Sequence, residues 1–460
     1  MGRTLLIATW GQPALWGPAV YVLEERERRT LEHCTSLPLL LEKYGDADVA
    51  LLVLDSLVDE YADGRREGAC YECYDKLRGL LQGAARAASY SELRKGVKKF
   101  VEELLECMGI DGRARVVVCP AVGSPGGRWS FESKPGDFEA VALAGLGPRC
   151  LEEGYERVVL DLTHGVNFMP AVALRVAERL ANILLLAHGA KSVKLEVYNS
   201  DPYPPRSQRP ELRLNLVARE EVRAVRVPAP LPERLLRPTR QLDSQTSEGV
   251  RRVNEEYKRT VEVSLSALYY PLPLALHYSL SQAGEAPLRV MEDALGLWEH
   301  TVSVCGQRVK GALRLEPDAV YALLLVEAVL RGLGRPEYPA RLERLRETVK
   351  LYESISEPHY YLIVDELSRV EGALAKRKPL LIRLRLLLRS LVERRPQRGV
   401  RLCELYGEEC RDGTPDKRVM IAHAGLQKEL VLVDPQGTIS YKGDVRQMLK
   451  EGGLLIPFAE

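Results

Sequence analysis

The sequence predicts an α/β domain built on a mainly parallel sheet, followed by a mostly α-helical second half. Short aliphatic runs alternate with longer helical segments through the first half, which is the rhythm of βαβ units. Four prolines between Pro228 and Pro238 then mark a boundary, after which helical periodicity dominates. A chain of 460 residues also exceeds one ordinary core, so we expect two domains, with three as an alternative.

Strand candidates in the first half are short runs rich in Val, Leu and Ile, at residues 4–9, 49–54, 116–119, 158–162, 192–198, 212–217 and 222–227. The connections at residues 71–108, 137–151 and 171–187 are long enough for crossover helices. The last three strand candidates have no long helices between them. We therefore expect the sheet to end in an antiparallel edge or hairpin.

The second half has helical periodicity at residues 250–268, 288–304, 317–333, 340–354 and 360–394. The last of these helices is expected to break or kink near Pro379. A hairpin is predicted near the end, with strands at residues 430–433 and 438–441. The predicted organisation is a first domain at 1–227, a linker at 228–245 and a helical region at 246–460.

Charge and hydropathy exclude several classes of protein. Lys and Arg total 65 against 64 for Asp and Glu, giving a net charge of +1, so RNA or a nucleotide must be met by a local basic patch. The basic run at residues 375–395 is better explained as a solvated helix face than as an RNA groove. The sequence shows no signal peptide and no apolar stretch long enough for a bilayer, so we expect a cytoplasmic protein without membrane contact.

Nine cysteines form an odd set without a paired framework. Cys70 and Cys73 make a C-x-x-C, but no second pair follows at zinc-site spacing, so no structural metal is expected. Free or buried thiols are expected throughout. Cys403 and Cys410 flank a short loop and could form a disulfide if the source is a hyperthermophile.

A strand-to-helix turn at residues 161–167 is the first candidate site. Asp161, Thr163, His164 and Asn167 lie where a buried strand ends and a helix begins, a position that binds ligands in open α/β sheets. The competing interpretation is that Asp161 and Thr163 merely cap the helix while His164 is exposed.

The end of the first strand is expected at the same rim of the sheet. Trp10 or Trp16 could stack on a base, and Gly11 and Gly165 allow a phosphate to approach the backbone closely. Each tryptophan could equally be a core residue. The sequence has no G-x-G-x-x-G and no P-loop, which argues against a dinucleotide cofactor or a nucleoside triphosphatase.

The second candidate site combines Arg418 and His423. Thr414 is expected to cap a helix, with Pro415 and Asp416 in its first turn, so that Arg418 and His423 lie in its opening turns. Arginine and histidine suffice for metal-free RNA cleavage, because histidine can move a proton while guanidinium stabilises the phosphorane. One histidine cannot be acid and base at once, but two copies across a symmetric dimer can. The alternative is an exposed arginine and a packing histidine.

These motifs together resemble a known family, the CARF-HEPN ribonucleases attached to type III CRISPR systems. The segments that carry the resemblance are Ala8-Thr9-Trp10-Gly11, Asp161-Leu162-Thr163-His164-Gly165-Val166-Asn167-Phe168, Tyr198-Asn199-Ser200-Asp201-Pro202 and Arg418-x4-His423-Ala424-Gly425. The resemblance implies an N-terminal Rossmann-like CARF domain and a C-terminal HEPN domain. Between the linker and about Cys410 it adds little beyond helicity.

The resemblance also implies a function in antiviral defence. In that family a homodimer, or a higher oligomer, binds a cyclic oligoadenylate across its two-fold axis, most often cyclic tetra-adenylate, and then cuts single-stranded RNA without metal or cofactor. The residues implied to contact the activator are Thr9, Trp10, Gly11, His164, Gly165 and Asn167. Arg418 and His423 are implied to be catalytic. The family usually has a polar residue directly after this arginine, whereas this chain has Val419.

Two other functions stay open at this point. The chain could be a ligand-sensing regulator whose helical half binds DNA, although the neutral net charge and the lack of an evident recognition helix argue against it. Alternatively, the first domain could itself be a ring nuclease that slowly opens a cyclic oligoadenylate held against the turn at His164.

Overall fold

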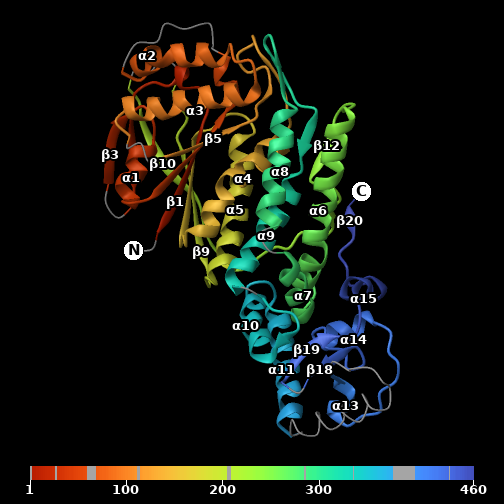
Figure 1. Cartoon of the computed structure of the whole chain (residues 1–460). Coiled ribbons are helices and arrows are strands. Elements are labelled where there is room, and N and C mark those ends of the chain that lie inside the picture. The colour runs from red at the N-terminus through yellow and green to blue at the C-terminus, as the bar shows by residue number, and fades with distance from the viewer. Residues whose placement is uncertain are drawn as a thin grey trace.

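An eight-stranded mixed sheet forms the N-terminal end of the molecule (Figure 1). The computed structural model describes residues 3–459 except 26–27, 60–68, 111–113, 205–208, 284–285, 335, 377–398 and 435. The strand order in the sheet is β3-β2-β10-β9-β8-β1-β4-β5. The strands are β1 (Thr4–Trp10), β2 (Ala19–Glu24), β3 (Arg28–His33), β4 (Asp48–Leu54), β5 (Arg115–Cys119), β8 (Arg157–His164), β9 (Val193–Ser200) and β10 (Glu211–Val222).

The predicted parallel sheet with an antiparallel edge is confirmed. Strands β9, β8, β1, β4 and β5 are mutually parallel, and every residue of the central β1 is buried. Strand β10 runs antiparallel to β9. One expectation is wrong: residues 222–227 form no separate strand, because β10 continues through a register shift between Leu216 and Ala218 as far as Val222. The sequence also missed the antiparallel β2–β3 pair.

Five helices connect these strands: α1 (Leu37–Tyr44), α2 (Ala69–Ala84), α3 (Tyr90–Cys107), α4 (Pro135–Glu152) and α5 (Met169–His188). Helix α3 starts where the Ser89 side chain accepts a hydrogen bond from the Glu92 amide, so the predicted helical connection at 71–108 consists of two helices. Helices α4 and α5 lie between the sheet and the helices of the second half (Figure 1).

The second half is mainly helical, as predicted. Its first helices are α6 (Ser244–Tyr269), α7 (Pro273–Ala283), α8 (Ala286–His300), α9 (Pro317–Leu333), α10 (Leu342–Glu353) and α11 (Glu357–Lys376). Helix α9 has the predicted bounds, and the sequence missed α7. The rest of the predicted helix at 360–394, including its kink near Pro379, and nearly all of the basic run at 375–395 lie outside the described residues.

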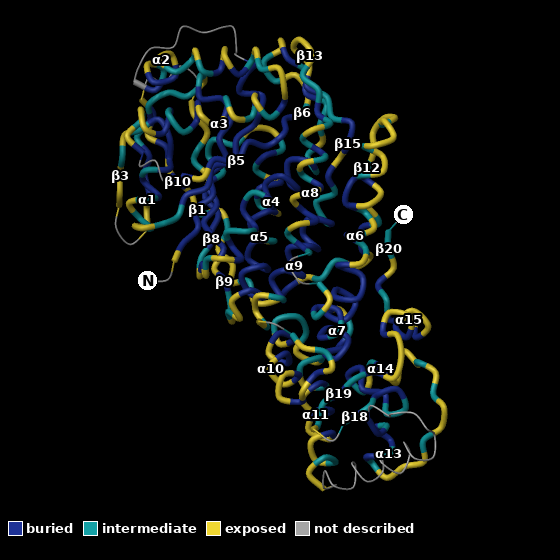
Figure 2. Tube along the Cα trace, viewed as in Figure 1, coloured by how far each residue is buried: buried dark blue, intermediate teal, exposed yellow. Residues whose placement is uncertain are grey.

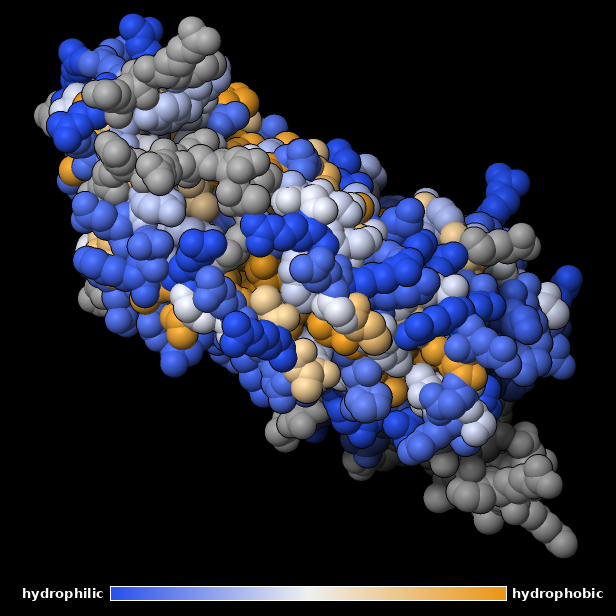
Figure 3. Space-filling model, turned by 90° about the horizontal axis from the view of Figure 1, so that it is seen from above, coloured by the Kyte–Doolittle hydropathy of each residue, from blue (hydrophilic) through white to orange (hydrophobic). Residues whose placement is uncertain are grey.

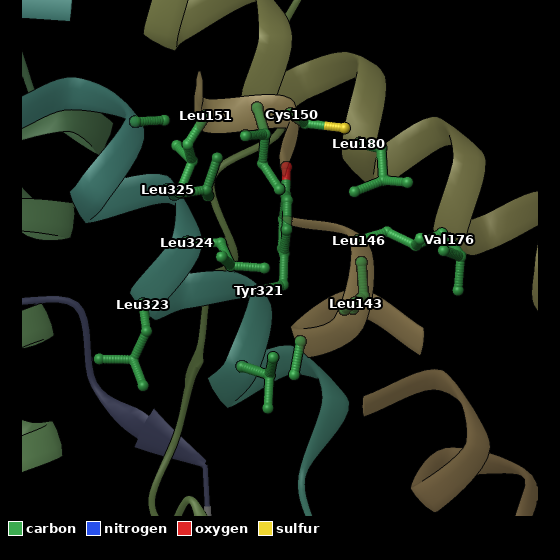
Figure 4. Packing of buried hydrophobic residues seen from close by; sticks show 14 of the residues in the cluster. Leu143, Leu146, Cys150, Leu151, Val176, Leu180, Tyr321, Leu323, Leu324 and Leu325 are labelled. Carbon is green, nitrogen blue, oxygen red and sulfur yellow. The ribbon is translucent and has the colours of Figure 1, made fainter. Parts of the chain in front are cut away.

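Helix α9 packs so closely against α4 and α5 that glycines are needed at two of the contacts. A Cβ atom on Gly147 of α4 would lie 2.6 Å from Leu324 Cδ1 of α9, and one on Gly332 of α9 would lie 2.2 Å from the Leu186 carbonyl oxygen of α5. Figure 4 shows side chains of α4, α5 and α9, including Tyr321, interleaved in one core. The hydrophobic core is therefore continuous across the proline-rich segment.

Short strands also join the two halves. In the proline-rich segment, β11 (Leu231–Pro232) pairs with β20 (Phe458–Ala459), and β12 (Leu236–Pro238) pairs with β15 (Leu313–Leu315). A further sheet combines β6 (Val122–Gly123) and β7 (Ser130–Glu132) with β13 (Ser303–Cys305) and β14 (Arg308–Lys310). The predicted domain boundaries, 1–227, 228–245 and 246–460, stay a prediction. The hydrophobic core is continuous across them, so packing does not mark where one domain ends.

A small α/β module forms the other end of the molecule (Figure 1). Its sheet contains β16 (Ala340–Arg341), β17 (Val400–Arg401), β18 (Val431–Val433) and β19 (Thr438–Tyr441), and its helices are α13 (Leu402–Tyr406), α14 (Lys417–Ala422) and α15 (Val445–Glu451). The predicted hairpin is confirmed, because β18 and β19 pair antiparallel. The two outer strands were not predicted.

The expectation of free thiols is wrong for most of the cysteines. Disulfides join Cys34 to Cys70, Cys73 to Cys107 and Cys403 to Cys410, while the remaining cysteines, Cys119, Cys150 and Cys305, are free. The first two bridges fasten α2 to the end of β3 and to α3. Sequence spacing could not reveal them, because each pairs cysteines that the fold brings together.

Burial is concentrated in the sheet and in the helices around α9 (Figure 2). The face seen in Figure 3 is mainly hydrophilic, with hydrophobic side chains in small separate groups. Within the described ranges, no helix is both long enough and apolar enough to cross a bilayer.

Because α5 and α9 approach so closely, we expect one added methyl group at their contact to lower the free energy of unfolding. Gly332→Ala should lower the free energy of unfolding by about 1–3 kcal/mol, because the new Cβ would overlap the Leu186 carbonyl. Gly296→Ala in α8 is the control, because a Cβ there meets no atom within 4 Å, and it should raise stability by about 0.5–1 kcal/mol through helix propensity. Unfolding of the wild type and both variants in denaturant measures these changes. A Gly332→Ala variant as stable as Gly296→Ala would contradict the close contact of α5 and α9.

Candidate functional site

The turn after β8 is held by a buried carboxylate. Asp161 accepts hydrogen bonds from the Thr163 amide (3.0 Å) and the Ser36 hydroxyl (2.6 Å), and burial raises the pKa of this carboxyl. Helix α5 begins after Phe168 without a side-chain cap, so the interpretation that Asp161 and Thr163 cap it is wrong. Asp161 instead fixes the chain that presents His164.

His164 and Gly165 line a pocket of about 420 Å³. The other lining residues come from the segment after β1, from β2, from the turn itself and from the end of β9, and include Trp16, Tyr21, Thr163, Asn199, Ser200, Asp201, Pro202 and Tyr203. Sequence reasoning gave no role to Tyr21 or Tyr203. The segment at 198–202 was part of the resemblance, which is the signal that could have placed its residues at this pocket.

The His164 imidazole is neutral and contacts two aromatic side chains, Tyr21 and Trp16. Its Nε2 lies 3.1 Å from the Tyr21 hydroxyl, and its ring centroid is 4.6 Å from that of Trp16. Burial lowers the pKa of this imidazole to about 3, and His33 adds a smaller effect in the same direction. Burial also raises the pKa of the Tyr21 hydroxyl. The pair can therefore stack and exchange hydrogen bonds with a ligand, but His164 brings no positive charge at neutral pH.

The predicted residues of β1 and its exit lie behind the turn. Thr9 is buried and its hydroxyl donates to the Asp161 carbonyl (3.3 Å), and Trp10 is buried with its ring edge-on to Trp16 at 5.0 Å between centroids. The Gly11 amide donates to the His164 carbonyl at 2.7 Å. These residues support the pocket wall, and they are absent from the described residues that line it.

Both predicted glycines are required by this packing. A Cβ on Gly11 would lie 2.5 Å from Val166 Cγ1, and one on Gly165 would lie 2.5 Å from Thr9 Oγ1. Asn167, with φ of 53°, is exposed and is not one of the described residues lining the pocket. The structure thus brings His164 and Gly165 to the pocket, places three predicted residues behind them and leaves Asn167 at the surface.

The second candidate site lies in the C-terminal module. Helix α14 is capped by Asp416, whose side chain accepts from the Val419 amide (2.9 Å), so the predicted cap at Thr414 is wrong. Gln427 holds the segment before this helix, because its side chain donates to the Thr414 carbonyl (3.0 Å) and accepts from the Asp416 amide (3.2 Å). The expectation that His423 lies in the opening turns of a helix is wrong, because α14 ends at Ala422 and His423 follows directly after it.

His423 lines a large cavity of about 1180 Å³. Its Nδ1 lies 3.2 Å from Glu366 Oε2 of α11, and its side chain is 42% exposed whereas that of Glu366 is 4% exposed. Basic and acidic side chains share the cavity wall, and they include Arg369, Lys376, Glu408, Arg411, Asp412, Lys428 and Glu429. Sequence reasoning missed Glu366, because nothing in its spacing on the helix distinguishes it.

Arg418 is placed differently from His423. It is exposed on α14, and the described residues lining the cavity include Val419 but not Arg418. Val419, which stands where the family usually has a polar residue, is 37% exposed. Within one chain, the structure therefore brings Val419 and His423 to the cavity wall and leaves the Arg418 guanidinium on the outer surface.

No cluster of three or more His, Cys, Asp or Glu side chains that could hold a metal ion occurs in the part of the chain that the structure describes. The first pocket nevertheless has the character of a ligand-binding site. Aromatic rings, a neutral histidine and hydrogen-bonding groups converge at the carboxyl ends of parallel strands, beside the N-terminus of α5. Fold and pocket together define a Rossmann-like α/β domain with a pocket at the carboxyl ends of its parallel strands.

Comparison with known proteins identifies this domain further. The family described as "CRISPR system endoribonuclease Csx1, CARF domain" matches residues 5–202. The CRISPR system endoribonuclease Csx1 of Methanocaldococcus jannaschii is 30% identical over 212 residues, which are 45% of this chain and 38% of that protein. Over residues 5–202 the chain is therefore similar to the Csx1 CARF domain, and the predicted resemblance to CRISPR-associated CARF-HEPN ribonucleases is confirmed for this part of the chain. The chain matches less than half the length of this relative.

The low pKa of His164 predicts how stability depends on pH. An unfolded chain protonates this histidine below about pH 6.5, whereas the folded protein does so only near pH 3, so the group makes stability fall as pH falls. The slope approaches about 1.4 kcal/mol per pH unit between these values. His164→Gln removes the effect, and the contributions of titratable groups common to both proteins cancel in the difference between their stabilities. Unfolding at several pH values between about 7 and 4 checks this, and a pH-independent difference would contradict it.

Proposed function

We propose that this chain is an endoribonuclease of CRISPR antiviral defence that cuts single-stranded RNA after its CARF domain binds a cyclic oligoadenylate. The observation that carries the proposal is the presence, in one chain, of the His164 pocket in a Csx1-type CARF domain and of His423 at the wall of a second, charged cavity. The C-terminal module takes the part of the HEPN ribonuclease domain, and the proposed location is the cytoplasm.

The first pocket fits part of a cyclic oligoadenylate, with cyclic tetra-adenylate as the expected activator. Its volume is within the range of small-molecule sites, and the rings of Trp16, His164 and Tyr203 offer faces on which adenine can stack. The N-terminus of α5 lies beside Gly165 and favours phosphate. The carboxylate of Asp201 already accepts from Arg213 N and Asn215 Nδ2, at 3.2 and 2.9 Å, which reduces its repulsion of an anion.

A homodimer completes both sites in this proposal, and higher oligomers are compatible with it. Leu15 and Tyr203 line the first pocket and are 37% and 42% exposed, and Val166 beside it is 36% exposed. This apolar rim suits a second copy of the chain, with the activator shared across the two-fold axis. The exposed position of Arg418 likewise suits a role at a seam between two chains.

The proposed chemistry uses His423 and Arg418. His423 accepts the proton of the ribose 2′-hydroxyl, whose oxygen then bonds to the adjacent phosphorus. The bond from phosphorus to the 5′-oxygen breaks, and His423 of the second chain supplies a proton to that oxygen. Arg418 stabilises the added negative charge on the phosphorane. Thr9, Trp10 and Gly11 would hold the activator site in shape, while His164, Gly165 and Asn167 would contact the activator.

The proposal predicts activator-dependent cleavage without divalent metal. In EDTA, cyclic tetra-adenylate should raise the rate of single-stranded RNA cleavage by on the order of 10-fold or more, because ligand binding shifts the chain toward its active state. Gel analysis of a labelled RNA measures the rate. A linear tetra-adenylate serves as the control. Cleavage that ignores the activator, or that EDTA abolishes, would refute the proposal.

The two histidines should separate binding from cleavage. His423→Ala should reduce cleavage by about 10²–10⁴-fold and leave activator affinity unchanged, because His423 supplies proton transfer. His164→Ala should weaken activator binding first and reduce cleavage only at low activator concentration. Calorimetric titration with cyclic tetra-adenylate and RNA cleavage assays measure the two effects. Equal loss of both properties in either variant would contradict this division.

A further inference from the structure

We infer that Glu366 is a positioning residue that fixes the tautomer and orientation of the His423 imidazole, an inference that rests on the proposed ribonuclease function. The two side chains come from separate elements, because Glu366 is on α11 and His423 follows α14. Their contact joins Nδ1 to Oε2 at 3.2 Å across 57 positions of sequence.

Glu366 is held in a fixed place by its surroundings. Its side chain is 4% exposed and projects from the buried face of α11, beside Ile363, Leu367 and Val370. Arg369 Nη1 lies 3.4 Å from the same carboxylate oxygen. A carboxylate is buried at a large cost unless charged or hydrogen-bonding groups surround it, and here Arg369 and His423 are the groups at that distance. A carboxylate fixed in this way can orient a more exposed ring.

The contact determines which nitrogen of His423 can act as a base. When Nδ1–H donates to the Glu366 carboxylate, the lone pair is on Nε2, at the opposite side of the ring. His423 is at the cavity wall, so Nε2 can then accept the proton of the 2′-hydroxyl. The same carboxylate stabilises the imidazolium that forms, as the aspartate does in a Ser-His-Asp triad. Glu366 thus acts through His423 and need not touch the RNA.

Glu366→Gln tests the inference, with Glu371→Gln as the matched control. Glu371 is on the same helix but pairs with Arg346, so its substitution removes the same charge away from His423. A glutamine can turn either its oxygen or its nitrogen toward Nδ1, which removes the preference for one tautomer. We expect kcat for RNA cleavage with activator to fall by on the order of 10- to 100-fold in Glu366→Gln, with KM little changed. Glu371→Gln should behave as the wild type.

A spectroscopic readout separates this inference from the proposed function. The ¹⁵N shifts of His423 in the full-length protein, assigned by comparison with His423→Ala, report which ring nitrogen is protonated in the neutral form. We expect protonated Nδ1 in the wild type and in Glu371→Gln, and a mixture or the opposite tautomer in Glu366→Gln. An unchanged His423 spectrum in a folded Glu366→Gln variant would overturn the inference. A wild type that cuts no RNA would overturn the proposed function, while the spectra would still decide whether Glu366 sets the tautomer.

Discussion

The packing of α9 against α4 and α5 is the constraint on which the rest of the structure depends. Helix α5 begins immediately after the turn that carries His164, and near its other end the Leu186 carbonyl meets Gly332 of α9 without room for a methyl group. Close-packed interiors transmit displacement, because neighbouring atoms leave little space to absorb it. The turn that carries His164 is therefore joined to the helical half by continuous packing, and the proline-rich segment does not separate them.

Ion pairs around a buried carboxylate fix the relative positions of α4, α5 and α9. Glu139 of α4 is fully buried, and it pairs with Arg175 and Arg179 of α5, while Arg179 also pairs with Asp318 of α9. Burial raises the pKa of the Glu139 carboxyl, against the opposing effect of the two guanidinium groups. Such a network contributes less to net stability than an apolar contact would, but sliding one helix past another leaves a charge unpaired in the interior. The ion pairs therefore set the register of α4, α5 and α9.

Local pattern predicted much of this architecture, and long-range contacts account for what it missed. The βαβ rhythm and the bounds of α9 follow from periodicity within each segment. By contrast, Tyr21 meets His164 across 143 positions of sequence, and Glu366 meets His423 across 57, and neither pair has a local signature. The cap of α14 shows the same limit, since Thr414 and Asp416 are both good capping residues and the sequence does not reveal that Gln427 bonds to the backbone of both. The sequence thus located part of each site and omitted Tyr21 and Glu366, the partners of its two histidines.

A continuous series of packed helices leads from α9 to the second site. Helix α10 packs against α9, and buried hydrogen bonds lock it to its neighbours: His277 of α7 to Thr348 at 2.6 Å, and the Tyr352 hydroxyl to the Ala267 carbonyl of α6 at 2.6 Å. Helix α11 packs against α10 and carries Glu366 (Figure 1). Coupling between sites requires an element with different positions in two states, and in this structure the ion pairs hold α4, α5 and α9 in a single register. Because Glu366 ends this series, a displacement of α11 would reach His423 through the contact between Glu366 Oε2 and His423 Nδ1.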